Sequence, residues 1–153
     1  MNNNKIKVGL IGFGRTGKAV ANALLQNTNF CLEWVLKRRN LLEHRSASEF
    51  LGVESEDEGT IYSSEHITVD ELLDSHPVDV IIDFSSTNGI YTYGKPASER
   101  NVKIISAISH YGEKEKNFLQ ELSEKTAVFW SPNITLGVNF LLFASKLLRR
   151  IAP

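Results

Sequence analysis

The sequence predicts an α/β fold in which helices lie on both faces of a doubly wound parallel sheet. Three observations support this prediction. A strand-like apolar run near the amino terminus passes through glycines into a helical pattern, strand-like and helical segments then alternate along the chain, and the run at 78–84 is apolar almost throughout. A strand buried on both faces has this composition, and alternating strands and helices form parallel sheets with right-handed crossovers.

Strands are expected where apolar, β-branched or aromatic residues gather between turn-forming residues. The run at 60–62 is the shortest, and it follows an acidic stretch at 54–58 that we expect to be a solvated loop. The expected strands are at residues 6–11, 30–36, 60–62, 78–84, 102–106 and 127–130.

Helices are expected between these strands. The first repeats alanine, valine and leucine at helical spacing up to Leu25. Thr68 and Glu71 have the spacing of a capping box, which predicts a helix start, and Pro96 predicts an irregularity in a later helix. The other expected helical segments are one or two turns within 41–51, then 68–76, 90–100, 114–125 and 136–151.

The 153 residues, of which 42% are hydrophobic and 23% charged, fit one globular domain. A net charge of −1 with interspersed charges gives no general basic field, so we expect no nucleic-acid or membrane partner. The single cysteine, Cys31, lies in an apolar run and is expected in the core of a protein from a reducing compartment. No membrane span or signal peptide is recognised, so a cytoplasmic location is expected. No residue cluster has metal-ligand spacing.

Gly12, Gly14 and Gly17 form a Gly-x-Gly-x-x-Gly pattern between the first strand and the first helix. In a dinucleotide site of Rossmann type, such glycines permit a tight turn, close approach of the backbone to a pyrophosphate, and packing of the helix against the strand. The free N–H groups of the helix then face the anion. The alternative is a tight turn whose glycines serve packing alone.

Lys37, Arg38 and Arg39 follow the second strand, where an NAD site usually has an acidic residue that binds the ribose 2′-hydroxyl. Arginine side chains suit a phosphate because their planar fork donates to two oxygens at once. We therefore expect a preference for NADP(H), with Arg15 as a further candidate ligand. A solvated basic turn and dual cofactor specificity remain open alternatives.

The fourth strand ends in a loop of small hydroxyl residues at 85–89. Ligands of open α/β sheets bind outside the carboxyl ends of the strands, so this loop should lie along the cofactor. Its hydroxyl groups are expected either to contact phosphate or ribose, or to cap the next helix.

Four segments together resemble the amino-terminal domain of the 4-hydroxy-tetrahydrodipicolinate reductase family, also called dihydrodipicolinate reductases. They are residues 8–17, 78–85, 106–112 and 131–139, of which the last, Ser-Pro-Asn-Ile-Thr-Leu-Gly-Val-Asn, is the most specific. The resemblance implies hydride transfer from NADPH or NADH to a cyclic dicarboxylate of lysine and diaminopimelate biosynthesis. It also implies a homotetramer built through a carboxyl-terminal domain.

The resemblance also implies which residues bind the cofactor, from the pyrophosphate through the adenosine end and the middle to the nicotinamide. In that order they are Gly12, Phe13, Gly14, Arg15, Thr16 and Gly17; Lys37, Arg38 and Arg39; Phe84, Ser85 and Ser86; and Ser106, Ala107, Ile108 and Ser109 with Pro132 and Asn133.

The sequence departs from the family pattern in two places. The family usually has Gly-Thr-Thr-Gly after the fifth strand, where this chain has Ser106-Ala-Ile-Ser109 followed by His110. The family segments that supply the proton and grip the dicarboxylate are not found in residues 1–153, so the chain is expected to be the dinucleotide-binding domain without the substrate domain. The catalytic residue stays unassigned, because His110 is either a proton donor or a surface residue.

The leading hypothesis is the cofactor-binding domain of such a reductase. The runner-up is a stand-alone NADP(H)-binding module that senses redox state without catalysis, and a third reading is another Rossmann oxidoreductase. The helix at 136–151 has little polar face, so we expect further chain or another subunit, as in a homo-oligomer, to cover it.

Overall fold

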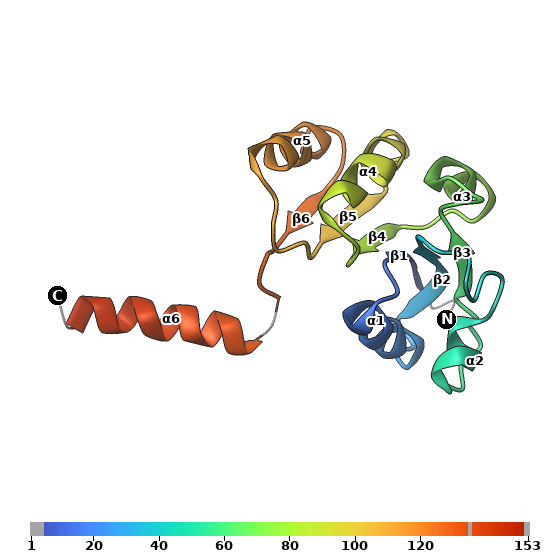
Figure 1. Cartoon of the computed structure of the whole chain (residues 1–153), viewed down its shortest axis with the longest axis horizontal. Helices are drawn as coiled ribbons and strands as arrows, with labels where there is room; N and C mark the ends of the chain where they lie inside the picture. Colours follow the sequence, from blue (N-terminus) through green and yellow to red (C-terminus); the bar gives the residue numbers. More distant parts are fainter. Residues whose placement is uncertain (1–4, 135, 152–153) are drawn as a thin grey trace.

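The computed structural model describes residues 5–134 and 136–151. Its strands are β1 (Ile6–Ile11), β2 (Phe30–Lys37), β3 (Thr60–Ser63), β4 (Val80–Asp83), β5 (Lys103–Ser106) and β6 (Val128–Trp130). They form one six-stranded sheet in the order β3-β2-β1-β4-β5-β6 (Figure 1). Every neighbouring pair is parallel. The strand order reverses between β1 and β4, and ligands of such sheets bind outside the strand ends at this point.

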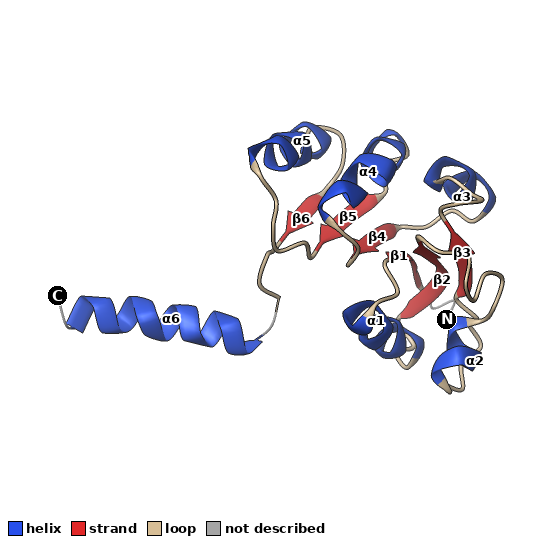
Figure 2. Cartoon of the chain, in the orientation of Figure 1, coloured by secondary structure: helices blue, strands red, loops and turns tan. Residues whose placement is uncertain are grey.

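The helices divide between the two faces of the sheet (Figure 2). One hydrophobic cluster joins the sheet to α1 (Arg15–Leu25) and α2 (Ala47–Leu51). A second cluster joins the opposite face to α3 (Val69–Ser75), α4 (Ile90–Glu99) and α5 (Glu113–Ser123). The predicted doubly wound sheet with helices on both faces is therefore confirmed.

Local signals explain several boundaries. Thr68 and Glu71 form the predicted capping box at the start of α3. A short 3-10 turn, η1 (Thr87–Gly89), leads into α4, and α4 runs through Pro96 without ending there. The irregularity expected at Pro96 is therefore not a break in the helix.

The segment at 41–51 is helical only in its second half. Only α2 is helical, and Leu42 and His44 have left-handed backbone with φ angles of 72° and 60°. Ser46 caps α2 by accepting a hydrogen bond from the Glu49 N–H, and it forms an antiparallel bridge with Thr60. The chain therefore runs along the edge of β3 before the helix begins, and the one or two helical turns expected within 41–51 form only at its end, as α2.

The last helix, α6 (Leu136–Ile151), extends away from the sheet (Figure 1). Large apolar side chains on it are exposed, namely Phe140, Leu141, Phe143, Leu147 and Leu148. Among the described residues, no helix combines the length and the hydrophobicity needed to cross a bilayer.

Candidate functional site

Three neighbouring cavities lie along the carboxyl ends of β1, β2, β4 and β5, and Ser85 and Ser86 line all of them. Their volumes are about 550 Å³ beside the basic turn after β2, about 160 Å³ between that turn and α4, and about 320 Å³ beside the loop after β5. We call them the basic, central and β5 cavities. Together they form a groove at the reversal of strand order.

The glycine turn after β1 has the geometry that its pattern predicts. Gly12 has a φ angle of +96°, and a Cβ atom there would lie 2.7 Å from the Phe84 carbonyl group. A Cβ atom on Gly17 would lie 2.0 Å from the Gly12 oxygen, so α1 packs directly against the turn. At Gly14, by contrast, a Cβ atom would have nothing within 4 Å. Two glycines are thus required by packing, whereas the third leaves open space at the groove.

The amino terminus of α1 faces this open space without a side-chain cap, because its N-cap residue is Gly14. The first N–H groups of a helix have no partner within the helix and carry its positive dipole end. Arg15 and Thr16 are exposed in the same turn, and Thr16 lines the β5 cavity. The arrangement suits an anion such as a pyrophosphate.

The basic turn is formed by Lys37, the last residue of β2, with Arg38 and Arg39 after it, and it lines the basic cavity opposite the glycines. The Lys37 ammonium group donates to the Leu41 carbonyl oxygen, and the Ser63 hydroxyl donates to the Arg38 carbonyl oxygen at 3.1 Å. Both arginines are exposed, and neither forms an ion pair with any described residue. Two guanidinium groups are therefore available to an anion in the groove.

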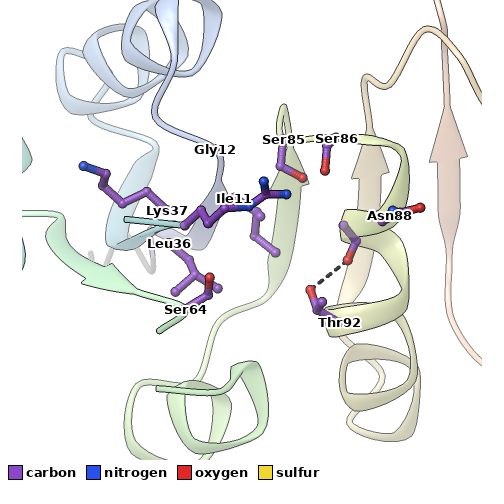
Figure 3. A pocket seen from close by; sticks show the side chains of 11 residues that line it. Ile11, Gly12, Leu36, Lys37, Ser64, Ser85, Ser86, Asn88 and Thr92 are labelled. Carbon is purple, nitrogen blue, oxygen red and sulfur yellow. Dashed lines mark hydrogen bonds between the residues drawn. The ribbon is translucent and has the colours of Figure 1, made fainter. Parts of the chain in front are cut away.

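The central cavity combines residues that the sequence predicted with others that sequence reasoning missed, among them Leu36, Ser64 and Thr92. Leu36, Lys37 and Ser64 lie on one side of it and Ser86, Asn88 and Thr92 on the other (Figure 3). The Thr92 hydroxyl donates to the Gly89 carbonyl oxygen at 2.8 Å. Ser64 directly follows β3, so the strand-end rule could have identified it, whereas Thr92 reaches the cavity only through the packing of α4.

A buried carboxylate lies below the loop after β4. Asp83 accepts hydrogen bonds from the Ser85 N–H at 2.8 Å, the Ser85 hydroxyl at 2.6 Å and the Tyr93 hydroxyl at 2.8 Å. Burial raises the pKa of Asp83, and the bonds from Ser85 and Tyr93 only partly oppose this shift. Burial also raises the pKa of Tyr93 well above its ordinary value.

The β5 cavity brings the loop after β5 to the loop after β4. Phe84, Ala107, Ile108 and Ser109 line it together with Thr16 and His110. The Ser109 hydroxyl and His110 Nδ1 are 2.6 Å apart, and the Thr87 hydroxyl donates to the His110 carbonyl oxygen at 3.2 Å. His110 thus presents an ionisable imidazole at this end of the groove.

Not every candidate residue lines the groove. Ser106 is fully buried, and its hydroxyl lies 2.9 Å from that of Tyr111, so its side chain faces the interior. Gly17 is packed against the turn, and Arg15 lies beside the cavities without lining them. Pro132 and Asn133 lie between β6 and α6 and line none of the three cavities. Within the described part of the chain, no group of three or more His, Cys, Asp or Glu residues is placed to hold a metal ion.

Comparison with known sequences identifies related proteins. A family model described as dihydrodipicolinate reductase, N-terminus, matches residues 6–134. The 4-hydroxy-tetrahydrodipicolinate reductase of Bdellovibrio bacteriovorus is 29% identical over 143 residues, which cover 93% of this chain and 50% of that protein. The enzyme of the same name from a Wolbachia of Brugia malayi is 29% identical over 155 residues, covering 97% of this chain and 52% of that protein. The chain spans about half the length of these curated relatives.

Solved structures show the same fold. Dipicolinate-bound dihydrodipicolinate reductase from Paenisporosarcina sp. TG-14 superposes with a TM-score of 0.71 at 18% identity, covering 94% of this chain and 53% of that one. RSP, a Rex-family repressor, superposes with a TM-score of 0.65 at 14% identity, covering 95% of this chain and 60% of that one. At these identities the likeness concerns the fold alone.

Proposed function

Because the chain belongs to the dihydrodipicolinate reductase amino-terminal family, we propose that it is the NAD(P)H-binding domain of a reductase that acts on 4-hydroxy-tetrahydrodipicolinate or a similar cyclic dicarboxylate. The observation that carries this proposal is the groove at the reversal of strand order, where the glycine turn lies opposite the basic turn. Bound there, the reduced dinucleotide supplies a hydride to the substrate.

The pyrophosphate binds at the amino terminus of α1. The open space at Gly14 admits a phosphate close to the backbone, and the uncapped N–H groups of the first turn donate to it. Phe13 lines the neighbouring part of the basic cavity, and Arg15 adds a positive charge beside the turn. Gly12 and Gly17 support this geometry through packing.

The adenosine end binds beside the basic turn. Arg38 and Arg39 clamp the ribose 2′-phosphate, because each guanidinium group can donate two parallel hydrogen bonds to phosphate oxygens. Lys37 contributes positive charge while its ammonium group remains bonded to the Leu41 carbonyl oxygen. The site therefore prefers NADPH to NADH.

The nicotinamide binds at the β5 cavity, between the loops after β4 and β5. Ser85 and Ser86 contact the middle of the cofactor, while Ala107, Ile108 and Ser109 surround its reactive end. Pro132 and Asn133 line none of the three cavities, and the family resemblance alone supports their contact with the nicotinamide from the segment before α6. Ser106 supports this loop from below, since its hydroxyl is buried.

We propose that residues 1–153 form the dinucleotide-binding part of the enzyme, and that groups outside them supply the proton and bind the dicarboxylate. The protein acts in the cytoplasm, in lysine and diaminopimelate biosynthesis, and takes no nucleic acid as a partner. Further chain or a second subunit of a homo-oligomer covers the exposed apolar side chains of α6.

Titration of the purified chain with NADPH and with NADH, followed by cofactor fluorescence, tests this function. We expect saturable binding of both and a lower Kd for NADPH. The proposal would be overturned if neither NADPH nor NADH binds at millimolar concentration. Our alternative, a stand-alone NADP(H)-binding module that senses redox state, predicts the same binding. Oxidation of NADPH in the presence of substrate separates the two functions only when the groups that bind the dicarboxylate are also present.

A further inference from the structure

Asp83 is a buried carboxylate that no cation neutralises among the described residues. It has no accessible surface, and its carboxyl oxygens accept hydrogen bonds from Ser85 and Tyr93. Burying a carboxylate is unfavourable unless hydrogen bonds replace its hydration. The hydrogen bonds from Ser85 and Tyr93 offset this cost, and they hold these two residues in place beneath the groove.

One carboxylate oxygen fixes the centre of the groove. Asp83 Oδ1 accepts both the Ser85 N–H, at 2.8 Å, and the Ser85 hydroxyl, at 2.6 Å. These two bonds set the main chain and the side chain of Ser85 together. Ser85 lines all three cavities, so its position determines the shape of the whole groove.

Gly89 leaves room for the Ser85 hydroxyl group. A Cβ atom on Gly89 would lie 2.3 Å from the Ser85 hydroxyl oxygen and 3.5 Å from Asp83 Oδ2. The backbone of Gly89 has φ −56° and ψ −40°, which any L-residue adopts. Glycine is therefore needed here for the space that the Ser85 hydroxyl occupies, and not for its backbone freedom.

The other carboxylate oxygen connects to the loop after β5. Asp83 Oδ2 accepts the Tyr93 hydroxyl at 2.8 Å, and that hydroxyl also interacts with Ser106. Ser106 Oγ lies 2.9 Å from Tyr111 Oη, at the end of the loop that lines the β5 cavity. In addition, the main-chain oxygen of Asp83 accepts the Ala107 N–H at 2.9 Å. The carboxylate thus joins the two loops that face each other across the groove.

We propose that Asp83 is a positioning residue for the dinucleotide: through Ser85 and Tyr93 it holds the loops after β4 and β5 in the shape that receives the cofactor, without touching the cofactor itself. This inference rests on the proposed function. It gives Ser106 a role in the buried network in place of direct contact with the nicotinamide.

The first test compares Asp83→Ala with Asp83→Asn. The alanine variant loses all three bonds and should raise the Kd for NADPH at least about tenfold. The asparagine side-chain oxygen can still accept both Ser85 bonds, so Asp83→Asn should stay within about threefold of the wild-type Kd. Asp79→Ala is the matched control. Asp79 lies just before β4, at the amino-terminal end of the strand and away from the groove, and its side chain also accepts a main-chain N–H, that of Lys7, at 2.8 Å. It should leave the Kd unchanged.

The second test leaves Asp83 intact. In Gly89→Ala the new methyl group should displace the Ser85 hydroxyl while the helical backbone accepts alanine, so binding should weaken about fivefold with a smaller fall in Tm than in Asp83→Ala. This variant keeps the inference testable if Asp83→Ala does not fold. Weakened binding that follows the loss of Tm equally in every variant, the Asp79 control included, would mean that Asp83 has only a structural role.

A third measurement needs no cofactor. Amide hydrogen exchange of the free protein should be faster in Asp83→Ala at residues 85–87 and 108–110, and unchanged in α1. Wild-type exchange rates at both loops would overturn the inference, whatever the affinities. If the wild-type protein binds neither dinucleotide but this exchange pattern is found, the proposed function fails while the coupling of the two loops by Asp83 stands.

Discussion

The Gly12 carbonyl oxygen occupies the place where a side chain on residue 17 would begin, only 2.0 Å from the position of its Cβ atom. Gly17 is therefore required by the packing of α1 on the turn. Gly14, two residues beyond Gly12, has nothing within 4 Å of the equivalent position. The glycine pattern thus separates into residues that build the turn and a residue that leaves room for a ligand.

This separation predicts that alanine at Gly17 lowers mainly the stability of the fold, whereas alanine at Gly14 lowers mainly the affinity for the cofactor. Gly17→Ala should lower the free energy of unfolding by about 1–3 kcal/mol, because its methyl group meets the backbone. Gly14→Ala should change it by less than about 1 kcal/mol, yet weaken NADPH binding about tenfold by filling the space for the pyrophosphate. Urea unfolding and cofactor titration of both variants measure this. Equal losses of stability in the two variants would contradict the account.

The free arginines of the basic turn should determine cofactor preference. Changing both Arg38 and Arg39 to alanine should raise the Kd for NADPH about 10- to 100-fold, because charge-assisted bonds to the 2′-phosphate are lost. The Kd for NADH, which lacks this phosphate, should stay nearly constant. Arg45→Ala is the control, because Arg45 is also exposed but lies outside the groove. An equal rise in the Kd for NADPH and for NADH would contradict this prediction and indicate a general charge effect.

Asp83 should give stability a specific pH dependence. Burial raises its pKa in the folded protein above the ordinary value of 3.8, so its ionisation costs more in the folded than in the unfolded state. As the pH rises from 3.8 through the raised value, the wild-type protein should therefore lose stability relative to Asp83→Asn, which does not titrate at this position. Urea unfolding of both proteins across this range measures the difference. A difference that is constant with pH would show that the carboxyl group is not perturbed.

Cys31 should react slowly in the native protein. Burial, then a hydrogen bond and charge from Asp57, raise the pKa of its thiol from 9.0 to about 11. Only the thiolate reacts, so alkylation by iodoacetamide at pH 8 should be about 100-fold slower than in the urea-unfolded chain. Equal rates would mean that the thiol is not held in this environment.

Much of the fold could be predicted because its signals are local. The glycine spacing, the apolar run of β4 and the capping pattern at Thr68 each describe one element and depend on no distant residue. The left-handed backbone at Leu42 and His44 has no such clear signal, because this conformation is uncommon for any residue other than glycine and leucine is not among the residue types enriched in it. It follows from the chain's course along β3, where Ser46 pairs with Thr60.

The candidate site was likewise predictable only in part. The glycine and basic turns follow strands directly, so the rule that ligands bind beyond strand ends places them in the groove. Ser106 also ends a strand, but its side chain points into the interior and pairs with Tyr111. Asp83 received no role from the sequence, although a lone acid at the end of an apolar strand is a recognisable signal. The contacts of individual residues with the cofactor stay predictions.

The most direct test of the central claim is an NMR titration of the isotope-labelled chain with NADPH, following the backbone amide signals. The account predicts that saturable shifts will concentrate at residues 12–17, 37–39, 85–86 and 107–110, along the groove. Shifts elsewhere on the protein, or none at millimolar NADPH, would contradict the account and leave the glycine turn with a packing role alone.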